Sequence, residues 1–253
     1  MVKVMKLFYS PIHGFIHKVL VVAHESGIWD KIEFVPVYPV QHGYSIAAIN
    51  PLHKVPTLAL DDGTVFYGSQ LIAEYLDSLA KSGPRLYPVD GPNRWDALRR
   101  LALADTLFEI TVVMALESLE KPPRRTVFEW NWAKVERALV QMEVDAQGGF
   151  DKFDIGQVAS LHALSYLDRQ TTRGLPAPVP IGYDWRVNRP ELHCWWKNTV
   201  KRPSVVAHFN KDYEGEDSAE FCQEKLGEVL TSQGKLAPDI PQPLPVDFVP
   251  PED

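Results

Sequence analysis

The chain has 253 residues, enough for one large domain or two smaller ones, and its composition is that of a soluble globular protein. Its net charge of -7 argues against nucleic acid or an anionic membrane surface as a partner. No apolar run approaches the roughly 20 residues of a membrane span, the N-terminus lacks a signal-peptide core, and Cys194 and Cys222 show no metal or redox spacing. These features predict a cytoplasmic protein without a metal centre.

The first part of the chain predicts a strand, a helix and a second strand. Residues 1–10 end in an apolar run and indicate a buried strand. Apolar residues then recur at helical spacing from 15 to 26, and Gly27 is a plausible stop. The next strand, 32–38, contains Pro36, which cannot donate a ladder hydrogen bond. We therefore expect this strand to lie at an edge of the sheet.

The stretch from 50 to 76, NPLHKVPTLALDDGTVFYGSQLIAEYL, predicts two more strands and a helix. A proline opens its apolar run, and the Val55–Pro56 bond is a place for a cis peptide. Asp61-Asp62-Gly63 is typical of a tight hairpin turn. Ser69 is a plausible N-cap of the following helix, and the start of a helix is a ready anion site.

The second part of the chain predicts helices only. A glycine- and proline-rich linker at 82–93 separates it from the first domain at 1–81. Helical patterns follow, broken at Pro122-Pro123 and Gly148-Gly149, and a further helix opens with Asp154 and Gln157 at capping-box spacing. This all-helical domain covers 94–210, and the extension 211–253 ends in a proline-rich, acidic tail.

The 50–76 stretch resembles the glutathione site of the glutathione S-transferase superfamily. The segments GQVASLHALSYLDRQ, DWRVNRPEL and KRPSV resemble bacterial members of it, so the resemblance covers residues 5–208. It implies a thioredoxin-like α/β N-terminal domain followed by an all-α helical bundle. It also implies glutathione as cosubstrate and a homodimer.

The resemblance assigns roles to several residues of that stretch. Val55, which precedes Pro56, would offer its main-chain N–H and C=O to the cysteine of glutathione. Ser69 would hold the γ-glutamyl carboxylate, and Lys54 would reach the glycine end. Asp105, on the first long helix, is the candidate for the γ-glutamyl amine.

Two positions depart from the family pattern. Gly68 stands where the family usually has Glu, Asp or Gln, so one polar contact to glutathione is missing or replaced. His53 stands where glycine is usual. These departures leave open a second interpretation, a glutathione- or ligand-binding scaffold without catalytic activity.

The chemistry requires a donor that stabilises the thiolate of glutathione, because an unperturbed thiol has a pKa of ~8.5. In the family this donor lies between the first strand and the first helix. Alignment with the bacterial pattern places it at His13, alignment with the tyrosine type places it at Tyr9, and Ser10 lies between them. The segment contains no cysteine, which disfavours thiol-reductase activity.

The electrophile site is expected between the two domains. Its walls, by resemblance, come from the first turn and the long first helix of the second domain: Ile12, Phe15, Leu107, Ile110, Thr111 and Met114. Their apolar character implies an aromatic or other hydrophobic electrophile. The sequence therefore predicts a glutathione transferase and does not separate conjugation from ether cleavage.

Overall fold

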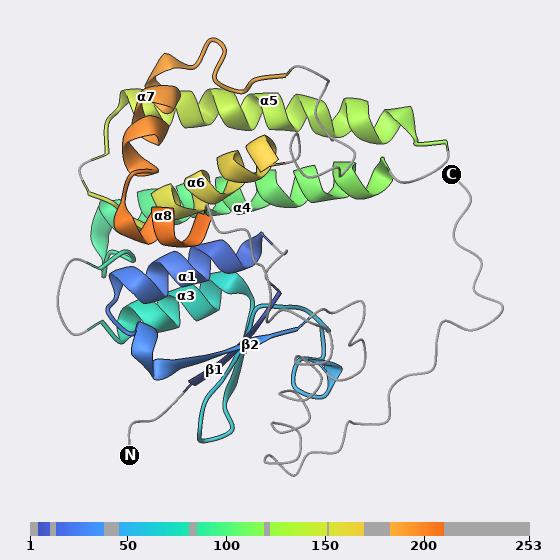
Figure 1. Cartoon of the computed structure of the whole chain (residues 1–253). Coiled ribbons are helices and arrows are strands. Elements are labelled where there is room, and N and C mark those ends of the chain that lie inside the picture. The colour runs from blue at the N-terminus through green and yellow to red at the C-terminus, as the bar shows by residue number, and fades with distance from the viewer. Residues whose placement is uncertain are drawn as a thin grey trace.

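The computed structural model of the protein describes residues 5–10, 14–37, 46–80, 85–118, 122–150, 152–169 and 183–209. Figure 1 shows a small sheet with helices α1 and α3 on one face and a layer of further helices beyond them. The order of elements agrees with the prediction of an α/β part followed by an all-helical part. The predicted donor residue His13, the pocket residue Ile12 and the extension 211–253 lie outside the described residues.

Among its described residues, the N-terminal half contains four strands and two long helices: β1 (Met5–Tyr9), α1 (Phe15–Glu25), β2 (Ile32–Pro36), β3 (Thr57–Ala59), β4 (Val65–Tyr67) and α3 (Ser69–Ser78). The strand order is β2-β1-β3-β4. β1 and β2 are parallel, so α1 serves as the crossover between them, whereas β3 is antiparallel to both of its neighbours. β2 is an edge strand, as Pro36 predicted.

β1 is buried on both faces of the sheet. Leu7 and Phe8 are each 0% exposed, although their side chains point to opposite faces. Leu7 belongs to the core that contains α1 and α3, while Phe8 packs with Val35, Ile46 and Val55 on the other side. Burial on both sides explains the continuous apolar run that identified this strand.

The turn between β3 and β4 confirms the hairpin prediction. Gly63 has φ +87, a conformation that favours glycine. The Leu60 N–H donates to the Thr64 carbonyl at 2.9 Å, and the Gly63 N–H donates to Leu60 at 3.0 Å. The hairpin therefore leads directly into the start of α3.

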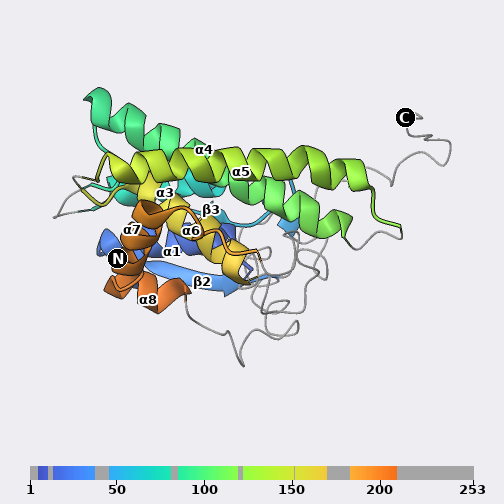
Figure 2. The same ribbon diagram turned by 90° about the horizontal axis from the view of Figure 1, so that it is seen from above.

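The helical half contains α4 (Gly91–Glu117), α5 (Arg125–Gln147), α6 (Ile155–Arg169), α7 (Pro190–Thr199) and α8 (Pro203–Phe209). Figure 1 shows α4 and α5 side by side above α1 and the sheet, and in Figure 2, seen from above, both helices lie in front of them. α4 begins at Gly91 rather than near Arg94, inside the stretch we expected to be linker. The reason is that Pro92 lies in the first turn, where a proline is compatible with a helix.

Asp154 fixes the start of α6. Its carboxylate accepts the Gln157 N–H at 3.1 Å and an Arg100 guanidinium N–H at 2.6 Å. The capping prediction is therefore confirmed for Asp154. The reciprocal arm of the box is not formed, because Gln157 Oε1, the oxygen that would accept the Asp154 N–H, accepts the indole N–H of Trp195 at 3.0 Å instead.

α6 crosses α4 at Gly156, where the backbones approach closely. A Cβ atom at Gly156 would lie 2.6 Å from Arg100 Cβ and 2.7 Å from the Ala97 carbonyl oxygen. Such distances are too short for a real contact, so the crossing depends on the missing side chain.

We expect Gly156→Ala to lower the free energy of unfolding by about 1–3 kcal/mol, because the added methyl group forces the α4 backbone away. Gly148→Ala is the matched control. Gly148 has φ -66 at the end of α5, and a Cβ there would lie 3.5 Å from the Asp145 carbonyl, an ordinary contact. Urea denaturation of both variants checks this, and equal stability of Gly156→Ala and wild type would contradict it.

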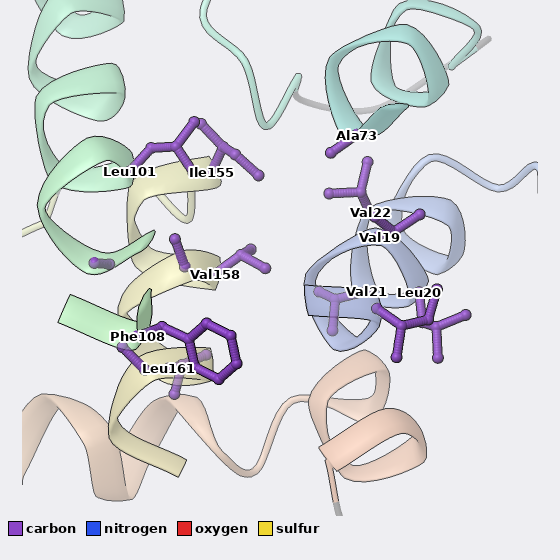
Figure 3. Close-up of a cluster of buried hydrophobic side chains, with 14 of the residues drawn as sticks. Val19, Leu20, Val21, Val22, Ala73, Leu101, Phe108, Ile155, Val158 and Leu161 are labelled. Carbon is purple, nitrogen blue, oxygen red and sulfur yellow. The ribbon is translucent and has the colours of Figure 1, made fainter. Parts of the chain in front are cut away.

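One apolar core runs through both halves. Figure 3 shows Val19 and Val22 of α1 beside Ala73 of α3, and Val158 and Leu161 of α6. All of these side chains are buried and belong to one cluster. The helical half is therefore packed directly against α1, and this junction positions the residues described next.

Candidate functional site

The loop before β3 is organised by Asn50, which is 1% exposed. Its amide donates to the Lys54 carbonyl at 2.8 Å and to Thr57 Oγ1 at 2.9 Å, while its Oδ1 accepts the Leu52 N–H at 2.9 Å. The loop is thus held at both ends by one side chain. His53, within it, has φ +52, a left-handed conformation that explains why glycine is usual at this position.

The Val55–Pro56 peptide bond is cis, as predicted. Val55 is 6% exposed, and its main-chain N–H and C=O make no hydrogen bond to any described residue. Lys54 is exposed beside it. An extended peptide could therefore pair with the main chain at this point.

The start of α3 lies next along the chain. The helix begins at Ser69, and its N-cap is Gly68, with φ +82. The prediction of Ser69 as the N-cap is therefore wrong by one residue. No side chain of a described residue caps the helix, so the N–H groups of the first turn are available to a ligand with a negative charge.

A buried ion pair lies behind this helix start. Lys18 of α1 is 0% exposed, and its Nζ lies 2.5 Å from Oδ2 of Asp105 on α4. The same carboxylate oxygen accepts the Gln70 amide at 2.8 Å, whereas Oδ1 is buried without a partner among the described residues. Burial lowers the pKa of the Lys18 ammonium from its usual value, and the Asp105 carboxylate opposes that shift.

This arrangement changes the interpretation of Asp105. The resemblance made Asp105 a direct contact for glutathione, but one of its oxygens is occupied by Lys18 and Gln70. Neither of these two partners was identified from the sequence. The available signal in the sequence was Lys18 directly before the apolar run from Val19 to Ala23, since a lysine buried within such a helix needs a partner for its charge.

The predicted donor segment is described in part. Ser10 follows β1 directly and is 0% exposed, and its Oγ has no hydrogen-bond partner among the described residues. Tyr9 is half-buried, with its ring edge-on to Phe34 at 6.2 Å between centroids. At Gly14, a Cβ would lie 2.5 Å from Phe108 and 2.7 Å from His162, so these rings fix where the segment meets α1.

The predicted pocket residues fall into two groups. Leu107, Thr111 and Met114 are each 1% exposed and face the core, while Phe15 and Ile110 are half-buried. Phe15 is edge-on to Phe108, with centroids 4.5 Å apart. The sequence did not predict the aromatic cluster around Phe15, because its members come from two further helices. Phe108 and His162 lie next to Phe15, and Tyr166 lies next to Phe108.

Other features of the described residues lie away from this site. A groove of about 570 Å³ is lined by α5 and the segment before α7, and it includes none of the predicted site residues. No group of three or more His, Cys, Asp and Glu residues among those described could hold a metal ion. In the same part of the chain, no helix is long and apolar enough to span a membrane.

Comparisons with known proteins agree with this geometry. The profile of the glutathione S-transferase N-terminal domain matches residues 14–79. Over 208 residues the chain is 28% identical to the uncharacterized GST-like protein YibF of Escherichia coli K12, covering 80% of this chain and 96% of that protein.

Two proteins of known structure are slightly more similar to this chain in sequence than YibF is. A glutathione transferase family member from Pseudomonas fluorescens Pf-5, crystallised with bound glutathione, is 30% identical, with a TM-score of 0.72 over 81% of this chain and 98% of that one. A glutathione S-transferase from Methylobacillus flagellatus with GSH bound is also 30% identical, with a TM-score of 0.71 and the same coverage. These likenesses confirm the predicted fold, a thioredoxin-like domain followed by a helical one.

Proposed function

Because the chain belongs to the glutathione S-transferase superfamily, we propose that it binds glutathione between the Val55 main chain and the start of α3, and transfers it to a hydrophobic electrophile. The observation that carries the proposal is that, among the described residues, the Val55 main-chain groups have no hydrogen-bond partner and no side chain caps the start of α3. Glutathione has a peptide main chain that can pair with Val55 and a carboxylate that can bind the start of α3. Two relatives at 30% identity were crystallised with glutathione, which supports this ligand.

The proposed reaction is attack of the glutathione thiolate on an electrophilic carbon atom, in which a C–S bond forms and the leaving group departs with the electrons of the bond that breaks. The thiol must first lose its proton, and each unit by which its pKa falls requires about 1.4 kcal/mol of thiolate stabilisation. His13, Ser10 and Tyr9 are the candidate donors. An aromatic electrophile would lie near Phe15 and Ile110, the two half-buried members of the predicted pocket.

The thiolate absorbance of bound glutathione, followed across pH, tests the catalytic part of the proposal. In wild type, bound glutathione is expected to be a thiolate near neutral pH. In one of the variants His13→Ala, Ser10→Ala and Tyr9→Phe, the thiolate absorbance near neutral pH is expected to disappear. The alternative, a binding scaffold, is favoured by the complete burial of Ser10. Binding of glutathione with no thiolate near neutral pH, in wild type and all three variants, would establish that alternative.

We expect Ser69→Ala to weaken glutathione binding about ten-fold, because a hydrogen bond to a charged carboxylate is lost. Isothermal titration calorimetry measures the effect. Ser78→Ala, at the other end of α3, is the control, since its hydroxyl is exposed and donates only to the Tyr75 carbonyl at 2.6 Å. Unchanged affinity in Ser69→Ala would overturn the assignment of the carboxylate site.

We also propose a cytoplasmic homodimer with domains at 1–81 and 94–210. Exposed apolar side chains next to the site support a dimer: Tyr67 on β4 is 39% exposed and Leu71 on α3 is 49% exposed. Light scattering of the purified protein measures the mass, and a monomer at micromolar concentration would count against the dimer.

A further inference from the structure

Two histidines that are distant in the chain meet where α8 packs against α1 (Figure 1). His24 lies in the last turn of α1, and His208 lies in α8, 184 positions later. The Nδ1 atom of His24 is 3.3 Å from the Nε2 atom of His208. Their spacing in the sequence indicates no metal site, because the fold alone brings them together.

The distance between these two nitrogen atoms suits a shared metal ion. Two ring N–H groups cannot face each other this closely, so at least one of the two nitrogens presents a lone pair. A tetrahedral Zn²⁺ ion, with bonds of about 2.0–2.1 Å to imidazole nitrogens, holds two such ligands about 3.3–3.4 Å apart. The observed separation of 3.3 Å is therefore compatible with two ligands of one ion.

His208 is already fixed in position. The residue is 5% exposed, and its ring stacks on the Trp29 ring, with centroids 4.7 Å apart and an angle of 20° between the planes. Its main-chain carbonyl accepts a hydrogen bond from His17 Nδ1 at 2.7 Å. A ligand that is held in this way loses little conformational freedom when it binds an ion.

His24 connects the pair to solvent. The residue is exposed, and its ring is edge-on to that of His208, with centroids 5.4 Å apart. Among the described residues no third His, Cys, Asp or Glu completes a metal-binding group, so water molecules would fill the other coordination positions. Such an ion differs from a structural zinc with four protein ligands and exchanges with solvent.

We propose that His24 Nδ1 and His208 Nε2 bind one divalent transition-metal ion of the Zn²⁺ type, which clamps α8 to α1. Each neutral ring then carries its proton on its other nitrogen atom. Imidazole nitrogen suits Zn²⁺, whereas Mg²⁺ prefers oxygen ligands. The site uses none of the residues of the proposed glutathione site, so either proposal can fail while the other stands.

Calorimetry with Zn²⁺, on the full chain and without glutathione, tests the proposal. Wild type is expected to bind one ion at this site. His24→Gln is expected to weaken that binding by at least about ten-fold, because even the residues that support a metal ligand are typically worth that much. His24 is exposed, so its substitution leaves the core intact.

The matched control is the double variant His193→Gln/Cys194→Ser on α7. Its histidine and exposed cysteine are neighbours in sequence and are the other described pair of side chains that Zn²⁺ prefers. This variant is expected to keep the wild-type affinity. Zinc should also raise the urea midpoint of wild type but not that of His24→Gln, because an ion that binds the folded chain stabilises it.

Three results would overturn the site. The first is a wild-type chain that does not bind Zn²⁺, and the second is equal Zn²⁺ affinity in wild type and His24→Gln. The third is Mg²⁺ binding at the same site as tightly as Zn²⁺, which would exclude coordination by imidazole. Loss of binding in the α7 variant, with His24→Gln unchanged, would place the ion at His193 and Cys194 instead.

Discussion

Lys18→Met is expected to lower the free energy of unfolding by about 3–5 kcal/mol, the cost of leaving one member of a buried ion pair without its partner. Lys18 is completely buried, and Asp105 is 4% exposed. Without the ammonium, the Asp105 carboxylate keeps only the Gln70 amide as a hydrogen-bond donor among the described residues. Urea denaturation measures the loss.

Two further variants separate charge from packing. Lys6→Met removes a lysine from a surface pair, 3.5 Å from Glu33, and is expected to cost less than about 1 kcal/mol. Lys18→Met/Asp105→Leu replaces the whole buried pair by apolar side chains, and most of the lost stability should return. A Lys18→Met variant no less stable than Lys6→Met would show that the pair contributes nothing.

Asp154→Ala should have the second largest effect, a loss of about 2–4 kcal/mol. The substitution removes the cap of α6, typically worth about 0.5–2 kcal/mol. It also removes the carboxylate that Arg100 contacts at 2.6 Å, and the Arg100 side chain is only 15% exposed. Because α6 lies at the centre of the helical half, thermal or urea unfolding of the whole chain reports this loss.

Asp145→Ala is the control for Asp154→Ala. Asp145 also binds an arginine, Arg99, through two contacts of 2.9 and 3.3 Å, but the Arg99 side chain is 48% exposed and no helix start depends on it. Its loss should cost less than about 1 kcal/mol. If both variants lose the same stability, neither the cap nor the burial of Arg100 matters.

The features that the sequence predicted correctly are local. Gly63 in its turn, Pro36 at an edge strand and Asp154 at a helix start each act on residues within a few positions. Even here the exact position can shift: Gly68, with φ +82, takes the N-cap position that we assigned to Ser69. A glycine before a serine leaves both alternatives open until the backbone conformation is known.

The features that the sequence did not predict join distant segments. Lys18 and Asp105 are far apart in the chain, and Gln70 reaches the same carboxylate from a third helix. Motifs identify Ser69 and Val55 because their neighbours in sequence define the geometry. No local pattern shows that a lysine in one helix neutralises an aspartate in another.

The burial of α1 has a consequence for the dynamics of the whole chain. Its side chains from Ile16 to Ala23 are all buried, since α3 packs against the helix from one direction and α6 and α8 from another. Over this stretch no face of α1 is left to water, so we expect that its amide hydrogens do not exchange with solvent through a local fluctuation of either half alone. We expect them to exchange when both halves separate, so the stretch from Ile16 to Ala23 should be the slowest-exchanging among the described residues and should join the two halves into one cooperative unit.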